Sequence, residues 1–323
     1  MRIAVFGAGA VGGHIAAKLA ARGHDVSVVG RGAHFEAMRE KGVTLIHGAD
    51  TIRGRVRTTD PGVQDVVFVT LKANALRAFA ERGAPLVGRH TGVVFAQNGI
   101  PWWYGIGLSA ERPKPPPLAR LDPGIRFLHE KQIIGCVVYS ANEVREPGVI
   151  VNNVPGNNML VVGHADDGDT DEIRALRALL SEADLHSPRT DDIRAAVWGK
   201  LVQNLSTAAL CTLTGATVKE VREDRRLAEL ARRLASEGKE IARAHGVDPE
   251  RAPPRPSGGQ SSGAISHKPS LLQDYERGRP MEIDALLVAV LEFAGGAGVA
   301  APTLETIVAL VVHKAAAKGL YED

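Results

Sequence analysis

The sequence predicts an α/β protein in which a doubly wound parallel sheet is followed by an all-helical domain. The chain has 323 residues, enough for about two domains. In its first half, short and continuously apolar runs alternate with helical patterns, as in a parallel sheet that helices cover on both faces. From about residue 169 onward the pattern is helical. We therefore expect one domain at residues 1–168 and a second at residues 169–323.

The strands expected in the first domain are short runs rich in valine, and a helical pattern at residues 11–22 separates the first two. Prolines cluster in residues 101–131 and disfavour regular structure, so we expect a long surface loop there. Residues 133–163 alternate apolar runs with glycine and asparagine, a pattern typical of an antiparallel meander. The expected parallel strands are residues 2–6, 25–29, 65–71 and 92–96.

The second domain is expected to begin with a helix whose first turn carries Asp171 and Glu172, where acidic residues complement the helix dipole. Residues 253–263 are rich in proline, glycine and serine and interrupt the helices. Two interpretations of this stretch stay open: a flexible surface loop, or a segment that moves beside a site. The expected helices are residues 171–183, 190–213, 218–244, 271–278, 280–295 and 302–318.

The composition excludes several classes of protein. Apolar residues make up 44% of the chain and charged residues 24%, which excludes wholesale disorder. A net charge of +2 and an aromatic content of 4% argue against nucleic-acid binding. Cys136 and Cys211 are too few for a disulfide scaffold or a cysteine-built metal cluster. Because the chain shows neither a secretory signal nor a long apolar run, we expect a cytoplasmic protein that binds no membrane.

A glycine-rich turn, GAGAVG, joins the first strand to the first helix. In this setting the pattern is typical of a dinucleotide site in a Rossmann-type sheet. Gly7 allows the tight turn, Gly9 lets the backbone approach a pyrophosphate, and Gly12 lets helix and strand pack closely. The free N–H groups at the helix N-terminus then bind the phosphates. The cofactor-binding residues expected here are Gly7, Ala8, Gly9, Ala10, Val11 and Gly12.

The second strand indicates which dinucleotide is bound. An NAD site usually ends this strand with a carboxylate for the ribose 2′-hydroxyl, but here the first acidic residue is Glu36. Arg31 follows the strand instead, where a guanidinium group can bind a 2′-phosphate. We therefore expect NADPH (or NADP⁺) as the cofactor. The alternative is that Arg31 is a solvated arginine in a turn.

Polar residues that suit a reaction follow two expected strands and lie on one expected helix. Lys72 follows residues 65–71, and Asn98 follows Gln97 after another strand. Ligands of open α/β sheets bind at these carboxyl ends. Lys200 and Asn204 are four residues apart and therefore share one helix face.

Two more candidates lie further along the chain: Ser270 before an expected helix, and Glu282 after Pro280. Each candidate alone has an ordinary structural interpretation. Lysine is usually exposed, an acid in a first turn complements the dipole, and a serine before a helix is a common N-cap. Their joint presence with a dinucleotide turn favours a catalytic site.

These residues make the chain resemble the ketopantoate reductase family, within the 6-phosphogluconate-dehydrogenase-like superfamily. The resemblance spans nearly the whole chain, with the motifs in the family's order. It implies NADPH-dependent reduction of a 2-oxo acid, with 2-dehydropantoate (ketopantoate) to pantoate in pantothenate biosynthesis as the expected case. The matching motifs are GAGAVG, Arg31, LKA around Lys72, QNG at residues 97–99, WGKLVQN around Lys200 and SLLQD…EID from Ser270 to Asp284.

The resemblance also implies roles for these residues. Lys200 is implied to be the general acid, which protonates the carbonyl oxygen as hydride arrives, and Glu282 is implied to support it. Lysine suits this role because its ammonium group stabilises the developing charge and then releases a proton. No metal is expected, because the histidines lack the spacing of ligand pairs. The family places Lys72 and Asn98 at the cofactor, and Asn98, Lys200, Asn204 and Ser270 at the substrate.

Two features depart from the family's pattern. Ala208 stands where the family often has a second asparagine, and alanine cannot bond a substrate hydroxyl. Trp102 and Trp103 follow QNG, and three interpretations of them are open: lining the substrate mouth, contacting another subunit, or packing beneath the loop. The physiological 2-oxo acid therefore stays open.

The expected partner is a small 2-oxo acid, and self-association into a homodimer is left open. One alternative function is a 2-hydroxy-acid or opine-type dehydrogenase that acts on another 2-oxo acid. A different class is a non-catalytic NADPH sensor, which would not need Lys200, Asn204, Ser270 and Glu282 together.

Overall fold

The computed structural model describes residues 1–255 and 268–322, and these residues fall into two compact units. Each unit is assembled from separate stretches of the chain. The first unit contains Met1–Gln97, Pro123–Ile193 and residues 253–255, and the second contains Asn98–Asp122, Arg194–Ala252 and residues 268–322.

This division differs from the expected boundary between residues 168 and 169. Residues 169–193 belong to the first unit, because their helix contributes apolar side chains to the core of a large sheet. Residues 98–122 belong to the second unit, where the buried guanidinium group of Arg194 donates hydrogen bonds to the Tyr104 and Ile106 carbonyl oxygens. Most of the stretch 253–263 lies outside the described residues, so its two interpretations stay open.

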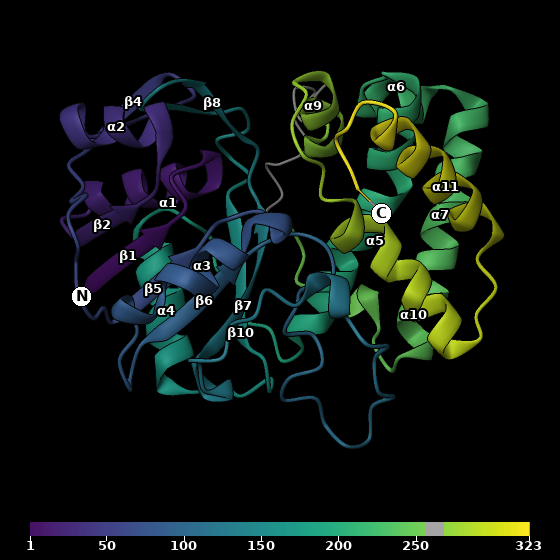
Figure 1. Cartoon of the computed structure of the whole chain (residues 1–323), viewed down its shortest axis with the longest axis horizontal. Helices are drawn as coiled ribbons and strands as arrows, with labels where there is room; N and C mark the ends of the chain where they lie inside the picture. Colours follow the sequence, from purple (N-terminus) through teal and green to yellow (C-terminus); the bar gives the residue numbers. More distant parts are fainter. Residues whose placement is uncertain (256–267, 323) are drawn as a thin grey trace. The chain divides into compact units, whose positions relative to one another are not determined.

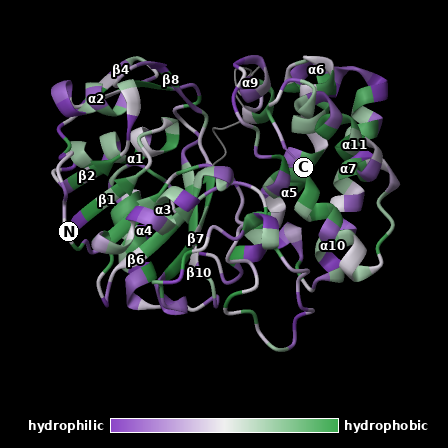
Figure 2. Cartoon of the chain, viewed as in Figure 1, coloured by the Kyte–Doolittle hydropathy of each residue, from purple (hydrophilic) through white to green (hydrophobic). Residues whose placement is uncertain are grey.

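A six-stranded sheet forms the centre of the first unit (Figure 1). In order across the sheet, the strands are β10 (Met159–His164), β7 (Ile133–Tyr139), β6 (Gly92–Ala96), β5 (Val66–Val69), β1 (Arg2–Phe6) and β2 (Asp25–Val29). All neighbours are parallel except β10, which runs antiparallel to β7. The four expected parallel strands are therefore confirmed. β5, β6 and β7 are buried along their whole length, which explains their continuous apolar runs (Figure 2).

A second, four-stranded sheet in the same unit is not apparent from the sequence pattern. In order, its strands are β4 (Asp50–Gly54), β3 (Val43–His47), β9 (Val149–Asn152) and β8 (Asn142–Glu146). Residues 133–163 divide between the two sheets, so the prediction of a single antiparallel meander is wrong. β7 is fully buried and suits a sheet interior, whereas the more exposed NEVRE run of β8 suits an edge.

Helices cover both faces of the large sheet, as a doubly wound fold requires. They are α1 (Ala10–Ala21), α2 (Gly32–Lys41), α3 (Arg77–Arg82) and α4 (Asp171–Glu182). α1 contacts strands of both sheets and shares one core with α4. α3 covers the opposite face, where the Phe79 ring meets the rings of Phe6 and Phe95 edge-on.

The second unit is built from helices. They are α5 (Ile193–Thr214), α6 (Val218–Glu223), α7 (Arg225–Ala244), α9 (Ser270–Glu276), α10 (Ala289–Ala297) and α11 (Pro302–Ala316). The single helix expected at residues 218–244 is two helices, because the Asp224 carboxylate caps a new one at the amides of Arg226 and Leu227. A π-helix, η6 (Asp284–Val288), precedes α10. Within the described residues, no helix is both long enough and apolar enough to span a membrane.

Candidate active site

The glycine-rich turn between β1 and α1 is shaped by contacts that leave no room for side chains. Gly7 has a φ of +123°, and a Cβ on it would lie 2.8 Å from Oγ1 of Thr70. A Cβ on Gly12 would overlap the Gly7 carbonyl oxygen. Thr70 follows β5, and its hydroxyl donates a 2.7 Å hydrogen bond to that same oxygen. Thr70 was not predicted, although a polar residue at the carboxyl end of an apolar strand is a usable signal.

The same turn leaves open space where a pyrophosphate would bind. Gly9 is exposed, and a Cβ on it would meet nothing within 4 Å. Gly9 precedes α1, whose first turn has no acidic residue and no side-chain cap. The amides of Ala10, Val11 and Gly12 therefore have no intrahelical acceptor and lie at the positive end of the helix dipole. This arrangement fits the phosphates of a dinucleotide.

Arg31 lies between β2 and α2, is exposed, and forms no ion pair with any described residue. Its neighbour Gly30 lines a pocket of about 300 Å³. A Cβ on Gly30 would lie 2.8 Å from the Cβ of Ala8, so this pocket adjoins the glycine turn. Further lining residues, which the sequence pattern did not reveal, are Thr58, Thr59, Asp60 and Arg82.

Lys72 and Gln97 follow two adjacent strands, β5 and β6. Gln97 donates a 2.9 Å hydrogen bond from Nε2 to the carbonyl oxygen of Leu71, which ties the two strand ends together. Lys72 is half-buried and precedes the short 3₁₀ helix η1 (Ala73–Ala75). Both residues therefore lie at the carboxyl ends of the parallel strands, the same end of the sheet at which the glycine turn follows β1.

A buried polar cluster anchors α1. His14 is 1% exposed, and burial, reinforced by the Lys18 ammonium group, lowers its pKa to about 3. Lys18 is itself buried and forms a 2.9 Å ion pair with Asp184, which lowers the pKa of that carboxyl group. His14 is therefore neutral at neutral pH, and the helix behind the glycine turn is fixed by an ion pair to a distant part of the chain.

The tryptophan segment after Asn98 is anchored to α5 and is not a plain surface loop. Trp103 and Tyr104 are buried. The Tyr104 hydroxyl accepts a 2.7 Å hydrogen bond from Nε1 of Trp198, and the Tyr104 carbonyl oxygen accepts hydrogen bonds from Arg194. Three interpretations of the tryptophan pair were open, and the burial of Trp103 agrees with packing beneath the loop.

Lys200 follows Trp198 on α5, in a segment fixed by close packing. A Cβ on Gly199 would lie 2.5 Å from the Cβ of Ala252, so this glycine lets the two backbones approach. Lys200 and Asn204 are both half-buried on one face of α5, as their spacing predicts. Ala208 follows on this face and is 6% exposed.

Asn98, Ser270 and Glu282 also lie in the second unit. Asn98 is half-buried, and its Oδ1 atom is buried without a hydrogen-bond partner among the described residues, as expected of an acceptor that serves a ligand. Glu282 is half-buried and lies two residues before η6. Ser270 is the exposed first residue of α9, but Pro269 occupies the N-cap position, so the N-cap interpretation of Ser270 is wrong.

The predicted residues therefore divide by unit. The first unit presents backbone amides and a guanidinium group, which suit phosphates, whereas the second presents an ammonium group, a carboxylate, amides and a hydroxyl, which suit a small polar substrate. Among the described residues, no three of histidine, cysteine, aspartate and glutamate are grouped to hold a metal ion. The first unit carries Gly7, Ala8, Gly9, Ala10, Val11, Gly12, Arg31 and Lys72, and the second carries Asn98, Lys200, Asn204, Ser270 and Glu282.

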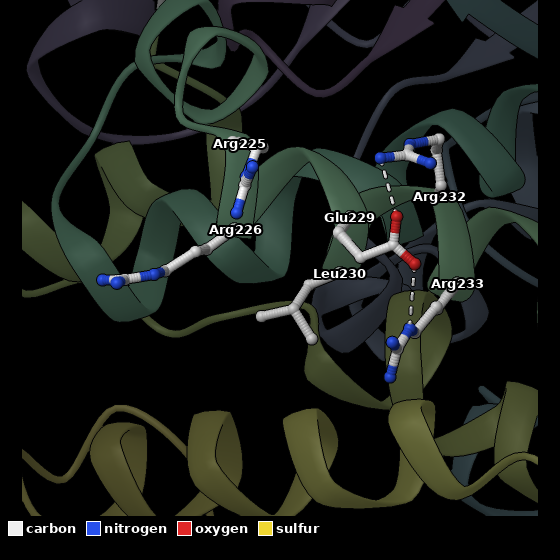
Figure 3. Close-up of a pocket in the computed structure, with 6 residues that line it drawn as sticks. All are labelled: Arg225, Arg226, Glu229, Leu230, Arg232 and Arg233. Atoms are coloured by element: carbon white, nitrogen blue, oxygen red, sulfur yellow. Dashed lines mark hydrogen bonds and ion pairs between the residues drawn. The ribbon is translucent and has the colours of Figure 1, made fainter.

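A second pocket, of about 460 Å³, lies along α7 and contains none of the predicted residues (Figure 3). Its lining consists of four arginines with Glu229 and Leu230. Glu229 pairs with Arg232 at 2.6 Å and with Arg233 at 3.2 Å, which neutralises part of the positive charge. Because all its lining residues come from one helix, this pocket is a surface hollow without the mixed groups of a catalytic site.

Comparison with other proteins shows the family and the fold of the chain. A family model described as ketopantoate reductase PanE/ApbA matches residues 3–166, and the model of its C-terminal part matches residues 192–315. A 2-dehydropantoate 2-reductase of Mesorhizobium japonicum is 39% identical, over 99% of this chain and 100% of the relative. A solved 2-dehydropantoate 2-reductase of Geobacter metallireducens is 27% identical with a TM-score of 0.79, over 96% and 99% of the two chains. A D-mandelate dehydrogenase solved with NADH and anilino(oxo)acetate shares the fold, with a TM-score of 0.81 at 21% identity over 99% and 100%.

Proposed function

The chain belongs to the ketopantoate reductase family, and from this premise we propose that it reduces a 2-oxo acid to a 2-hydroxy acid with NADPH. The expected reaction is 2-dehydropantoate to pantoate. The observation that carries the proposal is the open glycine turn at the N-terminus of α1, whose free amides and open space fit a dinucleotide.

The first unit would hold the cofactor. The amides of the first turn of α1 bind the pyrophosphate, and the exposed guanidinium group of Arg31 pairs with the 2′-phosphate that NADH lacks. The pocket lined by Gly30, Thr58 and Arg82 adjoins the turn and has room for the adenosine end. When bound, the reduced nicotinamide supplies the hydride.

The second unit would supply the proton and hold the substrate. Reduction of the carbonyl carbon leaves negative charge on its oxygen, and the Nζ ammonium group of Lys200 stabilises this charge and then donates a proton to the oxygen. Glu282 keeps that ammonium group charged and in place. Asn98, Asn204 and Ser270 hydrogen-bond the carboxylate and the other polar groups of the substrate.

The test is a panel of 2-oxo acids, each assayed with NADPH and with NADH. We expect kcat/KM to be highest for 2-dehydropantoate with NADPH. If the protein binds NADPH tightly but reduces none of these acids, the non-catalytic NADPH sensor becomes the favoured function. Consumption of NADPH and the 2-hydroxy acid product are measured together, so that slow oxidase activity is not mistaken for reduction.

A second candidate is a dehydrogenase for a 2-oxo acid with an apolar tail, and Ala208 favours it. Ala208 is buried on the Lys200–Asn204 face and offers a methyl group where a hydrogen-bonding side chain would select a substrate hydroxyl. In this case a branched-chain 2-oxo acid would equal or exceed 2-dehydropantoate in kcat/KM. Self-association into a homodimer, which the sequence leaves open, is tested by sedimentation of the purified protein.

A further inference from the structure

The π-helix η6 has an irregular hydrogen-bond pattern that frees one carbonyl group. In an α-helix the Ala289 amide would donate to the Ala285 carbonyl oxygen, four residues earlier. Here it donates to Asp284, five residues earlier. The Ala285 carbonyl oxygen instead accepts a 2.7 Å hydrogen bond from the Ile100 amide, which lies in a segment 185 residues away in sequence. Single π-turns of this kind occur often at functional sites.

Gly99 is what allows this contact. Its φ is +88°, and a Cβ on it would lie 2.5 Å from the Ala285 carbonyl oxygen and 2.7 Å from its carbonyl carbon. Ordinary contact begins at 3.4 Å. Any side chain at residue 99 must therefore push the segment and η6 apart by roughly 1 Å, a shift large enough to disturb a catalytic geometry.

The two segments joined in this way carry two of the proposed site residues. Asn98 immediately precedes Gly99, and Glu282 lies three residues before Ala285. The contact also has support from the other side of η6. The Tyr321 hydroxyl donates a 2.6 Å hydrogen bond to Oδ1 of Asp284, and the Met281 amide donates to the Leu320 carbonyl oxygen at 3.1 Å.

We infer that η6 positions the site: the Ala285 carbonyl group holds the Ile100 amide and thereby fixes Asn98 relative to Glu282. Ala285 and Gly99 are positioning residues, because they act through Asn98 and touch no substrate themselves. The inference rests on the proposed function only in taking Asn98 as a substrate ligand. The buried Oδ1 atom of Asn98, without a partner among the described residues, is the atom whose place is fixed.

The experiment compares Gly99→Ala with Gly298→Ala. Gly298 lies in the same unit with a φ of +65°, but a Cβ on it would meet nothing within 4 Å. Both variants are destabilised because alanine is placed at positive φ, but only Gly99→Ala disturbs the contact with η6. We expect Gly99→Ala to lower kcat/KM for the 2-oxo acid by about 10- to 100-fold. We expect Gly298→Ala to stay within about twofold of the wild type in kcat/KM and within about threefold in NADPH affinity.

A second readout separates this inference from the proposed function. Hydrogen exchange at the Ile100 amide is measured in both variants, and we expect it to be faster than in the wild type only for Gly99→Ala. Slow exchange in Gly99→Ala, or equal activity losses in the two variants, would overturn the inference even if the enzyme is a 2-oxo acid reductase. If the wild type reduces no 2-oxo acid, the exchange result alone decides the inference.

Tyr321→Phe is the fallback if Gly99→Ala does not fold. It removes the hydroxyl that holds Asp284 and leaves the ring in place. We expect kcat/KM to fall by about threefold to tenfold, the order of one lost hydrogen bond. Wild-type kcat/KM in this variant would count against a positioning role for η6.

Discussion

Gly9 and Gly12, three residues apart at the start of α1, have different roles, and alanine substitutions separate these roles. Gly9→Ala should leave the free energy of unfolding within about 0.5 kcal/mol of the wild type, because a Cβ there meets no protein atom within 4 Å. It should nevertheless weaken NADPH binding at least about tenfold, since the Cβ enters the space of the pyrophosphate.

Gly12→Ala is the counterpart. Its Cβ would overlap the Gly7 carbonyl oxygen, so this variant should lose about 1–3 kcal/mol of stability before any ligand is added. Urea unfolding and NADPH fluorescence titration measure the two effects. A Gly9→Ala protein that binds NADPH normally would mean that the pyrophosphate does not approach this residue.

Arg31 is expected to select the phosphorylated cofactor. A charge-assisted hydrogen bond contributes about 1.5–3 kcal/mol, so Arg31→Ala should weaken NADPH binding roughly 10- to 150-fold and leave NADH binding nearly unchanged. Arg39→Ala is the matched control, because Arg39 is exposed on α2 and pairs with Glu36. Equal losses for NADPH and NADH would show that Arg31 does not contact the 2′-phosphate.

Lys200 is expected to act on the reacting oxygen. Lys200→Ala should lower kcat about 10²- to 10⁴-fold, the usual range for a general acid, with NADPH affinity retained. Lys200→Arg should rescue little of this loss, because guanidinium keeps its proton. Lys219→Ala, at an exposed lysine that pairs with Glu223 on α6, is the control. A Lys200→Ala enzyme with wild-type kcat would exclude the proposed proton donor.

At the scale of an element, α1 makes the stability of the protein depend on pH. His14 has a folded-state pKa of about 3 against 6.5 in the unfolded chain, so the unfolded state takes up a proton first as the pH falls. The stabilisation is complete above pH 6.5 and is lost below it, by about 1.4 kcal/mol per pH unit, until the folded-state pKa is reached.

We therefore expect the free energy of unfolding of the wild type to decrease when the pH is lowered from 7.5 to 5.5. In His14→Gln this decrease should be smaller by about 1.4 kcal/mol. Burial also lowers the pKa values of His34 and His47, so part of the pH dependence of stability remains in the variant. Urea titrations at the two pH values measure the difference. His90→Gln, at an exposed residue, is the control. An unchanged pH dependence in His14→Gln would mean that His14 is solvated in the native state.

At the scale of the whole molecule, the chain crosses between the two units repeatedly, at residues 97–98, 122–123, 193–194 and 252–253. Unfolding of one unit therefore releases the ends of segments that belong to the other, and we expect the two units to unfold together. All three tryptophans lie in the second unit, so their fluorescence follows that unit, whereas far-UV circular dichroism follows both.

NADP⁺, which is expected to bind the first unit, tests this coupling. At 100 times its dissociation constant it should stabilise the protein by about 2.7 kcal/mol, and the urea transition should shift equally by fluorescence and by circular dichroism. Arg31→Ala at the same NADP⁺ concentration should show a smaller shift with both probes. A fluorescence transition that does not move would show that the units unfold independently.

The local geometry of several candidate site residues could be predicted because its signals are local. The spacing of Gly7, Gly9 and Gly12 specifies a tight turn, and the four-residue spacing of Lys200 and Asn204 specifies one helix face. Residue spacing does not indicate the roles of Thr70 and Arg82, although Thr70 does lie at the carboxyl end of an apolar strand. Thr70 matters through a hydrogen bond to a residue 63 positions away, and Arg82 matters only because it lines the same pocket as Gly30.

The sequence by itself determined the fold class, the parallel strands and the presence of a dinucleotide turn, because apolar runs and glycine spacings encode contacts between near neighbours. Only the tertiary structure decided how residues 133–163 divide between two sheets, to which unit residues 98–122 belong, and how η6 contacts Gly99. These outcomes depend on hydrogen bonds and packing between segments far apart in the chain, and such pairings leave no periodic trace in either segment.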